Sequence, residues 1–169
     1  MLYTNDYLKF TEYAWEKFYD SVDSSTFPEN DTSVIYESLS ENLDAMPFCV
    51  YLKRFLHERM GLDGDYMETP VEVYQKYLCD EFEKRGVPAS FDSKTARMGS
   101  TARNWLNQQT VKRSVVFLLA FGLGMGTDDV NDFLEKALHE RYINPKEPLE
   151  TISWYCFEHD MDYQGFQYL

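Results

Sequence analysis

The sequence predicts an all-α protein, a compact bundle of about seven or eight helices. Apolar residues recur at intervals of three and four along most of the chain. No segment of any length alternates with the period of two that marks a half-buried strand. Glycine and proline separate the periodic segments, with Gly61, Gly86 and Gly124 at expected helix ends and Pro47 and Pro70 at expected helix starts.

The first third of the chain is expected to hold three helices. One covers residues 4–22, where apolar residues recur at spacings of 3, 4 and 4. A short helix around residues 35–43 follows a loop rich in Ser, Asp, Pro and Asn. The third helix starts at Pro47, which needs no amide partner at a first helical position, and runs to Met60.

The remaining helices are marked by their start and stop signals. Residues 69–72, Thr-Pro-Val-Glu, predict a capping box in which Thr69 opens a helix that ends near Gly86. Two short helices around a glycine-containing turn are expected in residues 91–108. An apolar helix then covers 111–123, Thr127 caps another that runs to about residue 138, and a last one covers 148–159.

A length of 169 residues fits one domain or one domain with a helical extension. We interpret residues 1–68 as an N-terminal acidic helical region and 69–169 as a helical bundle, the two joining in one compact domain. The sparse, odd set of three cysteines favours a reducing compartment. With no signal peptide and no apolar run of membrane-spanning length, the expected location is cytoplasmic, without a membrane partner.

Charge is distributed unevenly along the chain. The formal net charge is −13, which disfavours a nucleic-acid partner for the molecule as a whole. Residues 84–113 are the exception, because their seven basic residues and one acid give 7 − 1 = +6, which leaves −19 for the rest. This basic segment either contacts a polyanion or docks on the protein's own acidic helices, and the sequence leaves both interpretations open.

Motifs with catalytic or metal-binding spacing are weak. Residues 122–126 have the spacing G-x-G-x-G, without the strand or the Lys-Ser/Thr that a phosphate loop requires. Cys156-x-x-His159 supplies at most half of a zinc site. Three histidines are too few for a phosphohydrolase centre. We therefore predict no catalytic residue, no metal ligand and no cofactor.

Residues 117–134, from Phe117 to Leu134, resemble the last two helices of phage-repressor-type (XRE-like) helix-turn-helix bundles. The resemblance covers roughly 50 residues and implies a helix-turn-helix-like C-terminal half. It places residues 100–107 at the recognition-helix position, although Trp105 and Leu106 suit a core or a protein contact better than base reading. The candidate binding residues that follow are Lys94, Arg97, Arg103, Asn104, Gln108, Lys112 and Arg113.

These observations favour a non-catalytic interaction protein, an acidic inhibitor or adaptor that binds a basic, nucleic-acid-handling protein. Small acidic helical proteins of mobile elements, including DNA-mimicking inhibitors of bacterial nuclease defence, are of this type. The first alternative is a helix-turn-helix transcriptional regulator that contacts DNA through residues 94–113. The second is a small hydrolase, which requires a pocket that gathers several of His57, His139, His159, Cys79 and Cys156.

Overall fold

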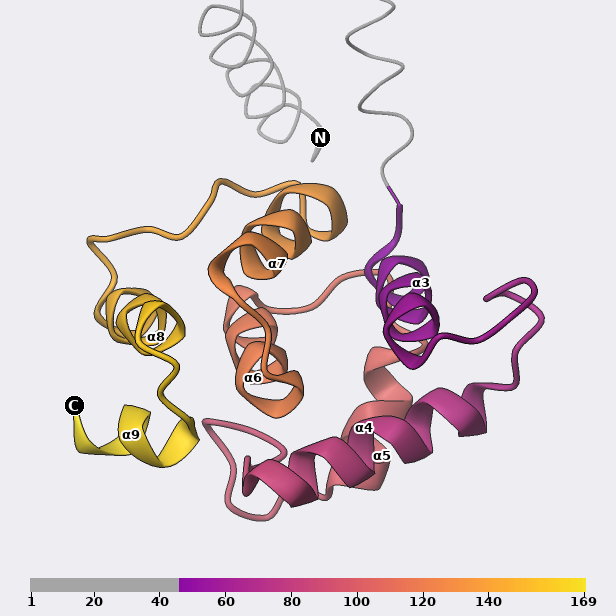
Figure 1. The fold of residues 1–169 in the computed structure, drawn as a ribbon, viewed down its shortest axis with the longest axis horizontal. Coiled ribbons are helices and arrows are strands. Elements are labelled where there is room, and N and C mark those ends of the chain that lie inside the picture. The colour runs from indigo at the N-terminus through magenta and orange to yellow at the C-terminus, as the bar shows by residue number, and fades with distance from the viewer. Residues whose placement is uncertain (1–45) are drawn as a thin grey trace, which may run out of the picture. The chain divides into compact units, whose positions relative to one another are not determined.

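The computed structural model describes residues 46–169, and this part of the chain is helical without any strand, as expected (Figure 1). The expected helices at 4–22 and 35–43 lie outside the described residues. The helices are α3 (Phe48–Met60), α4 (Val71–Arg85), α5 (Met98–Trp105), α6 (Arg113–Leu123), α7 (Thr127–Asp132), α8 (Pro148–Glu158) and α9 (Tyr163–Tyr168), and a π-helical turn, η1 (Phe133–Ala137), continues α7. None of these helices is long and apolar enough to cross a membrane.

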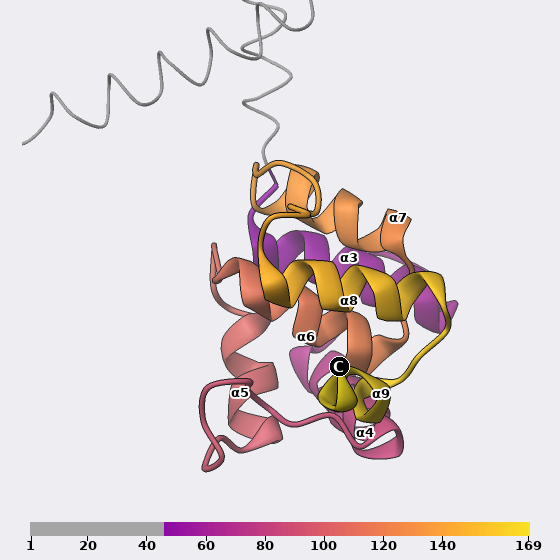
Figure 2. The ribbon, with the colours of Figure 1, turned by 90° about the vertical axis from the view of Figure 1, so that its left-hand side faces the viewer.

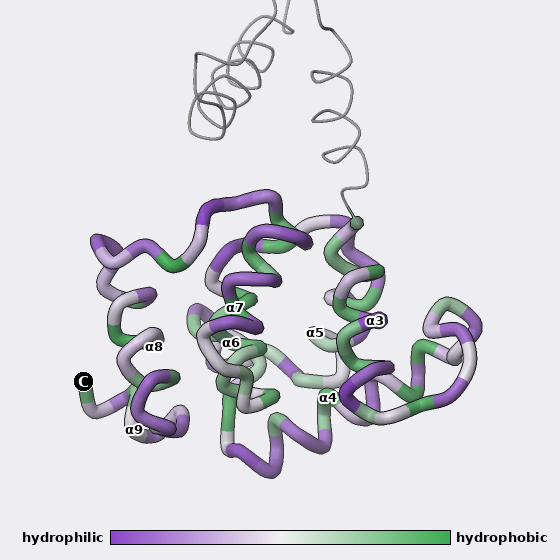
Figure 3. The backbone as a smooth tube through the Cα atoms, turned by 45° about the horizontal axis from the view of Figure 1, so that its top comes forward, coloured by the Kyte–Doolittle hydropathy of each residue, from purple (hydrophilic) through white to green (hydrophobic). Residues whose placement is uncertain are grey.

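Helix α6 forms the centre of the core. Every residue from Val116 to Leu123 is buried, and the hydropathy colouring of Figure 3 shows how apolar this helix is. Helices α4 and α7 and the η1 turn pack against α6, and Phe157 of α8 and Phe166 of α9 contact its aromatic rings from another side (Figures 1 and 2). A helix with an apolar sequence on all sides is stable only when neighbours cover all of it.

Helix α3 joins this core through an aromatic cluster and a backbone cap. The rings of Phe48, Tyr51 and Phe55 surround Phe133 at centroid distances of 4.7–6.3 Å. The amides of Phe48 and Cys49 donate to two carbonyls of the loop after α5, at 2.8 and 3.1 Å. These bonds satisfy amides that a helix N-terminus leaves without an intrahelical acceptor. Residues 46–60, expected to belong to the N-terminal region, therefore share one core with residues 69–169.

Three local expectations were wrong. Thr127 does not cap α7, because Gly126 is the N-cap and Thr127 is the first helical residue. Thr69 does not cap α4, because the helix begins one residue later, after Pro70, and no side chain caps it. The Thr69 hydroxyl donates instead to the carbonyl of Asp65, within the preceding loop. Residues 91–108 hold one helix rather than two, since Gly99 lies inside α5 and residues 91–97 form an irregular loop.

A buried hydrogen-bonded pair links α3 to α4. The Tyr74 hydroxyl donates to the carbonyl of Tyr66 at 3.0 Å, so the same oxygen accepts the Nδ1–H of His57, also at 3.0 Å. Both side chains are buried. This one hydroxyl therefore bonds both the buried His57 ring and a backbone carbonyl of the preceding loop.

Replacing Tyr74 with phenylalanine is expected to lower the free energy of unfolding by about 1–3 kcal/mol, because the Tyr66 carbonyl loses its donor and the buried His57 Nδ1 keeps only the longer contact with Thr69. Urea unfolding followed by circular dichroism measures the change. Tyr77→Phe is the matched control, since Tyr77 lies on the same helix, is half-buried, and its hydroxyl bonds no other residue within 46–169. Equal losses for the two variants would contradict the assigned role of Tyr74.

Candidate interaction surfaces

The structure exposes six of the seven predicted binding residues. Arg97, Arg103 and Asn104 lie on or next to α5, and the others lie in the flanking loops. Within α5 and just after it, Ala102, Trp105 and Leu106 are buried. Arg97, Arg103 and Asn104 therefore occupy the opposite, outward side, given the helical period of 3.6. The exposed residues are Lys94, Arg97, Arg103, Asn104, Gln108 and Lys112.

A cleft of about 270 Å³ lies beside α5, and Lys112 is the one predicted basic residue in its lining. Its lining includes Asp92 and Ala96 of the loop before α5, Thr101 and Trp105 of α5, and Lys112 at the start of α6. Lys94 and Arg97 are chain neighbours of this lining. We call Lys94, Arg97, Arg103 and Lys112 the basic surface. None of the four makes an ion pair with another residue of the described range.

The other three cations of the 84–113 segment are paired within the protein. Lys84 and Arg85 both contact Glu81, one turn earlier on α4, at 3.4 and 3.5 Å. Arg113 pairs with Glu140 and Glu150. The basic segment is therefore divided: three of its cations bind the protein's own carboxylates, and the other four are exposed.

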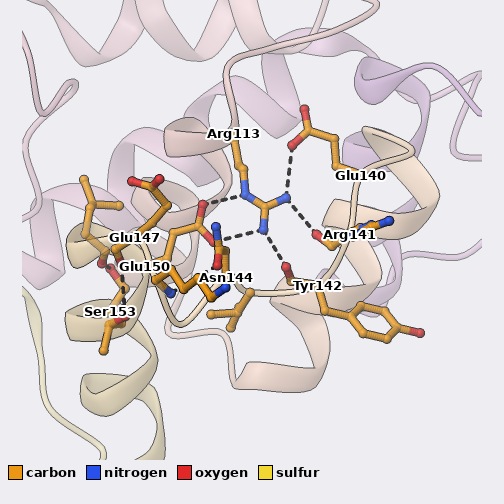
Figure 4. A network of polar contacts seen from close by, with 12 residues as sticks. Arg113, Glu140, Arg141, Tyr142, Asn144, Glu147, Glu150 and Ser153 are labelled. Atoms are coloured by element: carbon orange, nitrogen blue, oxygen red, sulfur yellow. Dashed lines mark hydrogen bonds and ion pairs between the residues drawn. The ribbon is translucent and has the colours of Figure 1, made fainter. Parts of the chain in front are cut away.

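Arg113 is the centre of a polar network and not part of the basic surface (Figure 4). Its Nε and one terminal nitrogen donate to the two carboxylate oxygens of Glu150 at 2.5 and 2.9 Å. The terminal nitrogens also donate to Glu140 and to the carbonyls of Arg141 and Tyr142 at 2.6–3.0 Å. Burial lowers the pKa of Arg113, but its bonds to both glutamates outweigh this and raise the pKa above its ordinary value.

The connections between helices bear on the helix-turn-helix expectation. Helices α6 and α7 are joined by the short turn at residues 124–126, and Gly124 has φ +62°. Helices α4 and α5 pack against each other, but the long segment 86–97 connects them. Helix-turn-helix pairs have turns of roughly 3–4 residues. The turn between α6 and α7 has this length. However, Asp128 and Asp129 lie in the first turn of α7, where their negative charge would oppose contact with DNA phosphates.

A second surface, acidic and aromatic, lies on α8. Trp154 and Tyr155 are 43% and 46% exposed. Glu147, Glu158 and Asp160 are exposed as well, and none of the three forms an ion pair with another described residue. We call these five residues the acidic-aromatic surface. Residues 147–169 contain five acids and no Lys or Arg, so their formal charge is 0 − 5 = −5.

No sequence motif marks this surface, although helical periodicity contains its signal. The last helix was expected to offer Ile152, Tyr155 and Cys156 to the core; Cys156 is buried and Ile152 partly buried, but Tyr155 is exposed. With that inner side fixed, the helical period puts Trp154 and Glu158 outward. A tryptophan on the outer side of an acidic helix is the pattern that marks a contact surface.

Within residues 46–169, no three His, Cys, Asp or Glu side chains lie close enough to hold a metal ion. The His159 ring lies on Tyr155 at 4.2 Å. Burial and nearby acids raise the thiol pKa of Cys79 and of Cys156, the reverse of what an activated nucleophile needs. A hydrolase centre built from these residues is therefore not supported.

Comparisons of the chain with protein-family models, with curated proteins and with solved structures found no match. The two surfaces and their chemistry are therefore the basis for the function proposed below.

Proposed function

We propose that this protein is a non-catalytic interaction protein, an acidic inhibitor or adaptor that binds a basic surface of a nucleic-acid-handling protein. The observation that supports it is the acidic-aromatic surface of α8. Tryptophan and tyrosine supply most binding energy at protein interfaces, because their large apolar area leaves water while one polar atom remains. Unpaired carboxylates beside them attract a cationic partner and repel nucleic acid.

The net charge of −13 supports the same class of partner. A protein surface that binds DNA or RNA carries lysine and arginine positioned for phosphates. An acidic protein can occupy such a surface and exclude the nucleic acid from it. Binding of this kind is steered by long-range attraction and weakens as salt is added.

A second function, direct DNA contact by a helix-turn-helix transcriptional regulator through residues 94–113, is supported by the basic surface. Its four cations are exposed on α5 and in the segments next to it, and they carry no internal ion pair among residues 46–169. Four phosphate contacts give weak, strongly salt-dependent binding, so this function requires a dimer or a partner.

One set of variants distinguishes the two functions. The α8 variant combines Glu147→Gln, Trp154→Ala and Glu158→Gln. The control combines Asp63→Asn, Met67→Ala and Glu83→Gln, which removes the same charge and one exposed apolar side chain elsewhere. The basic-surface variant replaces Lys94, Arg97, Arg103 and Lys112 with alanine.

Each immobilised protein is exposed to a lysate of the source cells, and the retained proteins are purified and titrated with duplex DNA. Wild type and control are expected to retain a nucleic-acid-binding protein that DNA displaces, and the α8 variant is expected to lose it. The opposite result has two parts. The α8 variant retains the same proteins as wild type, and wild type binds random duplex DNA whereas the basic-surface variant does not. That result would replace the first function with the second.

A further inference from the structure

The exposed side chains of α8 favour one kind of basic side chain over another in a partner protein. Building on the proposed function, we propose that the acidic-aromatic surface selects arginine over lysine in a basic segment of the partner protein. The exposed indole of Trp154 and the carboxylate of Glu158 provide this selectivity.

The indole and this carboxylate are neighbours on one side of the helix. Trp154 and Glu158 are separated by four residues, which puts their Cβ atoms about 5–6 Å apart. Both side chains are exposed, whereas Ser153 and Cys156 between and beside them are buried. One planar cation can therefore contact the ring face and the carboxylate together.

Glu158 is held in position by a neighbouring helix. The hydroxyl of Thr127, the first residue of α7, donates to one carboxylate oxygen of Glu158 at 2.5 Å. This bond restricts the side chain and leaves the second oxygen as an acceptor for a ligand. A side chain that is already ordered loses less conformational entropy when it binds.

No cation of the described residues competes for this site. Glu158 makes no ion pair within 46–169, and residues 147–169 contain no Lys or Arg. Glu147 and Asp160, at the two ends of α8, extend the negative charge along the helix. Charge complementarity therefore points to a basic protein segment as the occupant and excludes a nucleic-acid strand.

Arginine fits this pair of groups better than lysine does. A guanidinium is planar and weakly hydrated, so it stacks on an indole while its edge donates to a carboxylate. An ammonium is a compact, strongly hydrated charge that cannot do both without losing water. The arginine advantage should therefore depend on the ring, and the general attraction for cations should depend on the carboxylates.

Two fluorescein-labelled peptides of equal length and charge test this inference, one alternating arginine with glycine and the other lysine with glycine. Fluorescence anisotropy on the full chain is expected to show about fivefold tighter binding of the arginine peptide. Trp154→Ala should bring this ratio close to one, and Trp154→Phe should keep part of it. Glu158→Gln should weaken both peptides, whereas Asp63→Asn should change neither.

The indole N–H resonances of ¹⁵N-tryptophan-labelled protein provide a readout that general electrostatic attraction does not move. The arginine peptide is expected to shift the resonance that Trp154→Phe removes and to leave that of buried Trp105 unchanged. An arginine-to-lysine ratio that Trp154→Ala leaves intact would overturn the inference. The proposed function would still stand in that case if the retained partner depends on α8, so the two can fail separately.

Discussion

Replacing Arg113 with methionine is expected to lower the free energy of unfolding by about 3–5 kcal/mol. The side chain of Glu150 is only 8% exposed, and the Arg113 guanidinium neutralises its carboxylate. The substitution leaves a buried charge without its cation, and two backbone carbonyls of the 141–142 segment lose their donor as well. Urea or thermal unfolding followed by circular dichroism measures the loss.

Two further variants identify the cause of this loss. Lys112→Met removes the neighbouring charge from an exposed position and should change stability by less than about 0.5 kcal/mol. Adding Glu150→Gln to Arg113→Met should recover part of the loss, because a neutral amide is less costly to bury than a carboxylate. If Arg113→Met proved as mild as Lys112→Met, the network would contribute no net stability.

Replacing Gly122 with alanine is expected to destabilise the fold by about 1–3 kcal/mol. Gly122 lies in α6, where the ring of Phe82 from α4 rests directly on its backbone. An added Cβ would lie 2.0–2.4 Å from three ring carbons, far inside van der Waals contact. The buried ring has no free space to enter, so α4 and α6 must separate.

Gly99→Ala is the matched control for this prediction. Gly99 also lies inside a helix, α5, but its added Cβ would meet only the Gln75 side chain, at 3.9 Å. Alanine there is expected to stabilise the fold by up to about 1 kcal/mol, because it restricts the unfolded chain without a clash. Thermal unfolding of both variants should therefore show shifts of opposite sign. A stabilising Gly122→Ala would refute the proposed close approach of α4 and α6.

The sequence predicted the helices of the described region well where periodicity and end signals agreed. Gly61 and Gly86 do end α3 and α4 in the left-handed conformation, and Gly124 does so for α6. Local sequence signals gave the wrong helix caps where contacts with distant residues determine the helix N-terminus. The N-terminus of α3 is capped by a distant loop, which no local motif reveals, and Pro70 rather than Thr69 precedes α4.

The candidate site was predicted in part, for a related reason. Charge composition located the basic segment, but composition cannot show which cations pair across the fold. Arg113 and Lys112 are adjacent in sequence, yet one is bound to Glu150, 37 residues away, and the other is exposed. The short helix α9, of six residues, went unpredicted, whereas η1 lies within the helix expected from Thr127 to about residue 138. Segments that short are stabilised by packing more than by their own sequence.

The exposed cations around α5 and the exposed carboxylates at α8 form a local electric dipole within the described part of the molecule. The basic surface lies around α5 and the acidic-aromatic surface on α8, on different sides of the bundle in Figure 1. In the field of a highly charged macromolecule, such a dipole experiences a torque before any atoms touch. Encounters would then begin with one preferred end facing the partner, which increases the fraction of collisions that become productive. Reversing the charge of either end would therefore alter the rate of association as well as its equilibrium.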